Sequence, residues 1–180
     1  FIERNVILYR FSYITSQDLN QNNLFIMSEV KHIQKLFADL YDGVPWTEVK
    51  LTTILTDITS EQAAKKIIPE ANSIWQLVQH CVGWRDNVLR KLQGDVFNSP
   101  KDNYLSQPDN VSPQAWQHLL GHLEQSEKNW ERFLEQLDDN KLHEPYLPSK
   151  GKFTIYEVIH GILHHDNYHF GQIVMLKKLL

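Results

Sequence analysis

The C-terminal stretch, residues 154–180, reads TIYEVIHGILHHDNYHFGQIVMLKKLL and carries the strongest fold signal in the chain. Thr154 and Glu157 form a Thr-x-x-Glu capping box, which favours the start of a helix at this point. At about 100° per residue, the apolar side chains that follow fall within about 60° of one another on a helical wheel. They are Val158, Ile162, Ile173, Leu176 and Leu180. The stretch therefore predicts a long amphipathic helix with one buried face.

Three earlier segments show the same periodicity and have their own start signals. Ser28 can cap a first helix, a Ser-x-x-Gln capping box opens a second at Ser73, and Ser112 followed by Pro113 opens a third. The connection between the first two is longer, and we expect one or two short helices in residues 47–68. These features predict an all-α protein, an antiparallel four-helix bundle with a longer connection between the first two long helices.

Composition limits the class of protein. The 180 residues suffice for one domain with its own core, and 42% hydrophobic with 22% charged residues is ordinary globular usage. A net charge of −4 gives no basic surface for nucleic acid, and no apolar run approaches the roughly 18 residues of a membrane span. The single cysteine, Cys81, cannot form an intrachain disulfide. We therefore expect a cytoplasmic protein and interpret Cys81 as a small buried hydrophobe.

Residues 1–26 differ from the rest, because their apolar residues come in short β-rich clusters followed by a polar stretch. They lack the features of a signal peptide. We interpret them as an N-terminal extension outside the native domain, with Met27 as the biological start and residues 27–180 as the domain. A genuine N-terminal arm is the alternative.

Nine histidines are unusual for this length, and four of them lie in the C-terminal helix. On the wheel, His169 falls in the middle of the apolar face and His165 about 40° from it, whereas His160 and His164 lie about 140–180° from His169. Two inward imidazoles one turn apart suit a transition-metal ion, which would satisfy both buried polar groups. Core histidines with other buried partners are the alternative. We assign the outward pair to the surface or to an interface.

A metal site needs a third ligand, for which His80 in the second helix is the candidate, at the edge of that helix's apolar stripe. Asp166, Tyr168 and Gln172 lie near the ligands in sequence and are candidate partners of their ring nitrogens. The remaining histidines show no partner pattern and are assigned to the surface: His32, His118, His122 and His143.

Two motifs together resemble the DinB/YfiT-like superfamily. The segment HHDNYHFGQ, residues 164–172, is similar to its His-x3-His-x-Gly-Gln signature, and SIWQLVQH, residues 73–80, with Trp84 after it, is similar to its second-helix motif. The resemblance runs from about Met27 to Leu180. It implies a four-helix bundle that binds a divalent metal through three histidines, with water completing the site. Carried over position by position, the ligands are His80, His165 and His169.

The resemblance also implies a range of functions. Members of known activity include thiol-dependent transferases and isomerases that use bacillithiol, mycothiol or glutathione, and members are often homodimers. We therefore expect a metal-dependent S-transferase or hydrolase acting on an unknown small molecule, with zinc or nickel, or alternatively iron or copper, and with a low-molecular-weight thiol as a possible co-substrate. The competing hypothesis is a non-catalytic metal- or small-ligand-binding bundle of a stress response. Exposed tryptophans and the outward histidine pair would suit the interface of a homodimer.

Overall fold

The computed structural model describes residues 27–95, 98–147 and 152–180, and the regular elements in these ranges are helices joined by loops. The four long helices are α1 (Glu29–Tyr41), α4 (Ile74–Leu92), α5 (Pro113–Gln136) and α6 (Ile155–Lys177). Two short helices, α2 (Leu51–Leu55) and α3 (Ser60–Ala64), lie between α1 and α4, and the 3-10 helix η2 (Asp139–His143) follows α5. The all-α class and the short helices of the longer connection are confirmed. The predicted extension, residues 1–26, lies outside the described residues.

Each long helix begins at the residue that the sequence marks as its cap. The side chains of Ser28, Ser73, Ser112 and Thr154 each accept a hydrogen bond from the backbone N–H three residues further on. Both predicted capping boxes, at Ser73 and at Thr154, are complete. These bonds satisfy backbone donors that a helix leaves open in its first turn.

Two pairs of aromatic side chains pack in the core between the long helices. Phe37 of α1 stacks on Trp130 of α5, with ring centroids 5.0 Å apart, and Trp75 of α4 packs on Trp116 of α5 at 5.1 Å. The prediction of exposed tryptophans is therefore largely wrong. Of the five, only Trp46, in the loop after α1, stands in solvent, with 97% of its surface exposed.

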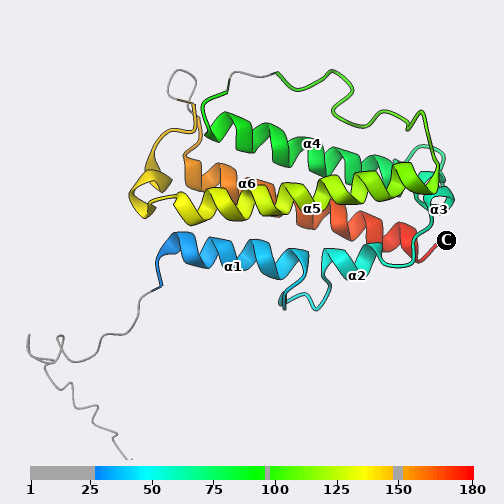
Figure 1. Cartoon of the computed structure of the whole chain (residues 1–180), viewed down its shortest axis with the longest axis horizontal. Coiled ribbons are helices and arrows are strands. Elements are labelled where there is room, and N and C mark those ends of the chain that lie inside the picture. Colours follow the sequence, from blue (N-terminus) through cyan, green and yellow to red (C-terminus); the bar gives the residue numbers. More distant parts are fainter. Residues whose placement is uncertain (1–26, 96–97, 148–151) are drawn as a thin grey trace, which may run out of the picture.

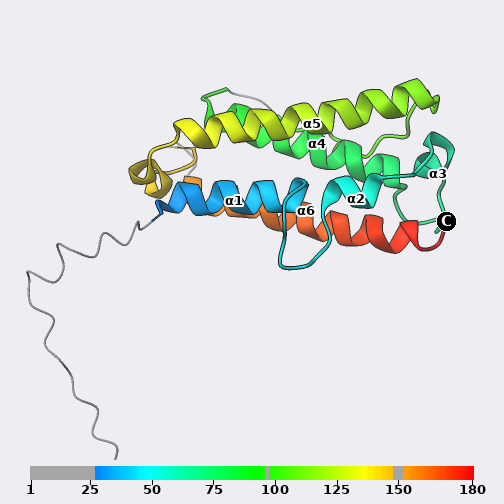
Figure 2. The same ribbon diagram turned by 60° about the horizontal axis from the view of Figure 1, so that its bottom comes forward.

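The directions of the helices decide what lies beside α4. Figures 1 and 2 show α4 and α5 running the same way, with α1 and α6 running opposite to them. A strictly alternating bundle would need only a short turn between α4 and α5. Here the connection has to return along α4, and it places residues 98–111 beside that helix (Figure 1). In the part of the chain that the structure describes, no helix is long and apolar enough to cross a membrane.

Candidate metal centre

Three histidines from two helices meet between α4 and α6. His80 comes from the middle of α4, and His165 and His169 come from consecutive turns of α6. One ring nitrogen from each lies within 4.8 Å of the others, and Nε2 of His80 is 2.9 Å from Nε2 of His165. Two ligands of one tetrahedral zinc ion would be about 3.3 Å apart, given metal–nitrogen bonds of about 2.0–2.1 Å. The structure thus brings together the three predicted histidines at a spacing that one ion fits.

The other ring nitrogen of each histidine faces an acceptor. Nδ1 of His80 lies 2.6 Å from the backbone carbonyl of Asn103, and Nδ1 of His169 lies 2.8 Å from Oε1 of Gln172. Nδ1 of His165 is 3.5 Å from the carboxylate of Asp166, a longer contact. A carbonyl only accepts, so the proton of His80 sits on Nδ1 and its Nε2 lone pair points to the shared space. Metal-binding histidines in proteins are oriented in this way.

Burial favours the neutral form of these imidazoles. The His80 side chain is almost fully buried, with 4% of the residue exposed, and desolvation lowers its pKa below the ordinary value of 6.5. Desolvation also lowers the pKa of His169. Both rings are therefore neutral at pH 7, and the neutral ring is the form that binds metal.

The buried face of α6 is centred differently from the prediction. The helical wheel predicted His169 at the centre of the buried face. In the structure the buried residues of α6 are centred on Asp166, which is itself fully buried. Ile159, Leu163 and Phe170 belong to this face, whereas Leu180 at the chain end is exposed. His165 and His169 consequently lie at the edge of the face, each half-buried, where a coordination position can reach solvent. Of the pair predicted to point outward, His164 is exposed, whereas His160 is half-buried.

A chain of buried ion pairs lies next to the three histidines, on the side of the protein core. Nη1 of Arg85 on α4 is 2.7 Å from Oδ2 of Asp166, and Nη2 of the same guanidinium bonds Glu127 of α5. Arg85 is 2% exposed. Asp166 of α6 therefore lies between Arg85 and His165, and Arg85 joins α4 to both α6 and α5 through Asp166 and Glu127. Of the three candidate partners, Asp166 and Gln172 contact ring nitrogens of His165 and His169, and the exposed Tyr168 packs its ring against that of His169, with centroids 4.9 Å apart.

The loop beside α4 holds the ring of His80 in place, a contact that the sequence patterns did not indicate. Asn103 and Tyr104 both have positive φ (56° and 60°), an uncommon backbone conformation for side chains of this size. This turn aims the Asn103 carbonyl at His80, and the Asn103 side chain accepts a bond from Nε1 of Trp84 at 2.9 Å. Gly83 makes the close approach possible, because a Cβ there would lie 2.4 Å from the Tyr104 ring.

Gly83→Ala is therefore expected to push the loop off α4. Overpacking of this kind costs about 1–3 kcal/mol of stability. Displacement of the Asn103 carbonyl should also weaken metal binding about 10–100-fold, the usual effect of losing a hydrogen-bond partner behind a ligand. Urea unfolding of the metal-free protein and a metal titration measure the two effects.

Gly121→Ala is the matched control, since a Cβ on this glycine of α5 meets nothing within 4 Å. It should stabilise the protein by about 0.5–1 kcal/mol, because alanine is the better helix former. Equal metal affinity in the two variants would contradict the role of the loop.

Cys81 does not compete as a ligand. It lies with His165 and Asp166 in a second group of side chains that metal geometry allows. However, its side chain is buried, and desolvation raises the pKa of the thiol well above 9.0, which disfavours the thiolate that binds metal. Asp166 is already engaged by Arg85. The prediction of a small buried hydrophobe agrees with this environment.

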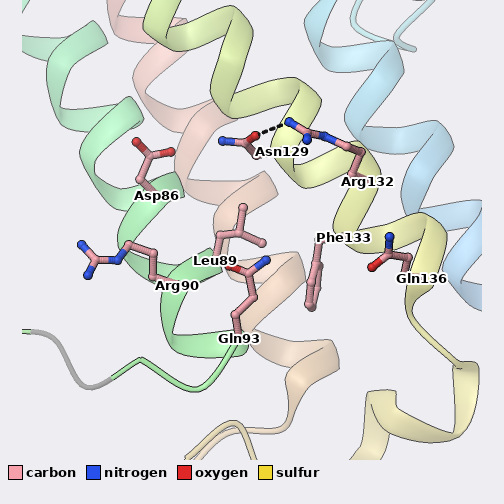
Figure 3. A pocket seen from close by; sticks show the side chains of 8 residues that line it. All are labelled: Asp86, Leu89, Arg90, Gln93, Asn129, Arg132, Phe133 and Gln136. Atoms are coloured by element: carbon pink, nitrogen blue, oxygen red, sulfur yellow. Dashed lines mark hydrogen bonds between the residues drawn. The ribbon is translucent and has the colours of Figure 1, made fainter.

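A polar cavity of about 500 Å³ lies between α4 and α5, away from the histidines (Figure 3). Its charged groups already have protein partners: Arg90 pairs with Asp95, Arg132 bonds Asn129, and Asp86 accepts a bond from Ser126. Among the described residues, none that lines this cavity belongs to the three-histidine group.

Comparison with known proteins identifies one family. A model of the DinB superfamily matches residues 46–173, which include all three candidate ligands. No curated protein and no solved structure matches the chain.

Proposed function

This chain belongs to the DinB superfamily, and from that premise we propose that it is a metal-dependent enzyme whose divalent ion is held by His80, His165 and His169. One observation carries the proposal. Three imidazoles converge at ligand spacing while the other nitrogen of each faces an acceptor. The donor set fits a transition-metal ion, because imidazole suits zinc, nickel, iron and copper. We expect zinc or nickel.

Three protein ligands are typical of catalytic rather than structural zinc sites. When bound, the ion would supply Lewis acidity that lowers the pKa of water or of a thiol. The chain's own residues would orient the ligands: Asn103 and Gln172 fix the rings of His80 and His169. His165, with 24% of its side chain exposed, marks the open side. A low-molecular-weight thiol or water is the nucleophile that we propose, for S-transfer or hydrolysis.

The test begins with metal analysis of protein purified without a nickel column. We expect about one zinc or nickel ion per chain. A screen for thiol transfer with bacillithiol, mycothiol and glutathione follows, and a hydrolase screen is run in parallel. Stoichiometric metal without turnover in either screen would favour the non-catalytic, ligand-binding alternative. Protein that neither carries nor takes up a divalent metal would contradict the proposal.

We also propose that the protein forms a homodimer. Trp46, 97% exposed, lines a hollow of about 250 Å³ together with His160 and His164, and Val44, two residues earlier in the chain, is 84% exposed. A patch of this kind is typical of an interaction surface. Light scattering at micromolar concentration should give twice the chain mass, and Trp46→Glu should give the monomer. A monomeric mass for the wild type would contradict the dimer.

A further inference from the structure

A second hollow lies at the C-terminal end of α6 and has an apolar wall. Its volume is about 490 Å³, within the range of small-molecule sites, about 300–1,000 Å³. It lies between α6, the start of α4 and the segment before α4. The apolar side chains that line it are those of Ile68, Ala71, Leu77, Met175, Leu176 and Leu179. Several of them are exposed, Met175 by 61%, so the apolar surface faces solvent.

This apolar pocket adjoins the candidate metal centre through two shared residues. Gln172 lines the pocket, and its Oε1 lies 2.8 Å from Nδ1 of His169. Tyr168 also lines it, and its ring contacts the ring of His169. The apolar pocket and the three-histidine group therefore border each other at Tyr168 and Gln172.

We propose that the apolar pocket holds the non-reacting, apolar part of the substrate, whose other end carries the group that meets the metal. The inference rests on the proposed function and adds the class of substrate: an amphiphilic small molecule with an extended apolar chain or ring. The composition supports this occupant, because apolar walls with a few polar groups, here Asn72, Tyr168 and Gln172, are typical of small-molecule sites. The cavity of Figure 3 is lined mainly by polar side chains and shares no lining residue with the three-histidine group.

Alkyl hydroxamates of increasing length test the proposal, because their head group binds divalent ions and their tails probe the pocket. The full chain, loaded with zinc, is titrated with acetohydroxamate, butanohydroxamate, hexanohydroxamate and octanohydroxamate. The short members should bind with similar affinity, since their tails end before the pocket. Beyond that length, affinity should increase about fourfold for each methylene that is buried.

Gly171→Leu blocks the pocket, because Gly171 lines it and a Cβ there meets nothing within 4 Å. We expect this variant to keep its zinc and the affinity for acetohydroxamate while losing the dependence on tail length. Gly161→Leu is the control, since Gly161 lies in the same helix with equally open space and away from the pocket. It should behave as the wild type. Met175→Gln, six residues from His169, makes the pocket wall more polar without adding bulk. It should reduce the dependence of hydroxamate affinity on tail length.

The outcomes separate the two claims. Metal-dependent binding of acetohydroxamate with no tail-length effect, or with the same effect in all three variants, overturns the pocket and leaves the metal centre intact. Failure of every hydroxamate to bind in a zinc-dependent way overturns the proposed function and with it this inference. A change of oligomeric mass in Gly171→Leu but not in Gly161→Leu would assign the surface to a second copy of the chain instead.

Discussion

Replacing His80, His165 or His169 with alanine is expected to abolish stoichiometric metal binding in the proposed centre. Each variant retains two of the three imidazoles that lie within 4.8 Å of one another, and two ligands do not hold a divalent ion tightly. The expected content falls from about one ion per chain to a small fraction of one. Elemental analysis after dialysis, with a metal titration of each variant, measures the loss.

The same variants should lose the stabilisation that metal gives the folded protein. A ligand present at 1,000 times its dissociation constant stabilises the folded state by about 4 kcal/mol. We expect thermal unfolding of the wild type to shift upward with added zinc and that of the three variants to stay unchanged. Helical content should persist, because alanine favours the helix and the apolar contacts of α6 remain. Circular dichroism checks this condition.

His164→Ala is the control, because it removes the imidazole next to His165 in sequence that is exposed in the structure. It should retain the metal and the zinc-dependent shift. Loss of metal in His164→Ala together with retention in His169→Ala would show that the ligand face of α6 has been assigned wrongly.

The local features of the fold could be predicted because they depend on neighbouring residues. The caps at Ser28, Ser73, Ser112 and Thr154 involve atoms three residues apart, so their sequence patterns suffice to place the helix starts. The i, i+4 spacing of His165 and His169 likewise fixes their common side on any helix. To propose His80 as the third ligand, the family motif was needed in addition to the helical wheel.

The remaining features depend on partners far along the chain. A wheel of apolar residues cannot place Asp166 at the centre of a buried face, because the reason for its burial is Arg85, 81 residues away. The predicted antiparallel bundle did not include the shared direction of α4 and α5, whose long connection brings Asn103 to His80. A glycine in the middle of a helix, such as Gly83 in α4, indicates that another segment packs closely against the helix. The sequence does not show that this segment carries Tyr104.

Asp166→Asn is expected to cause the largest loss of stability among single substitutions with nearly unchanged volume. Its carboxylate is fully buried and lies 2.7 Å from a guanidinium that is 2% exposed. Removing one member of a buried ion pair leaves the other charge buried without a counter-charge, which lowers the free energy of unfolding by about 3–5 kcal/mol. Because Arg85 keeps Glu127 as a counter-charge, we expect a loss of stability near the lower end of this range, about 3 kcal/mol. Urea unfolding of the metal-free protein measures it without any contribution from bound ion.

Asp95→Asn makes the same chemical change in an exposed arginine pair. Arg90 and Asp95 are 2.9 Å apart, with about half of each side chain in water (51% and 54%), so the expected cost is about 0–1 kcal/mol. A similar urea midpoint for the two variants would show that the buried pair contributes nothing special.

Metal affinity separates the two roles of Asp166, since its other oxygen faces Nδ1 of His165 at 3.5 Å. If that contact orients the ligand, zinc should bind Asp166→Asn about 10–100-fold more weakly, whereas Asp95→Asn should bind it as the wild type does. An unchanged affinity combined with the stability loss would restrict Asp166 to the core. Both effects together would mean that the ion-pair chain through Arg85 and Glu127 holds the helices and orients the metal ligand with the same carboxylate.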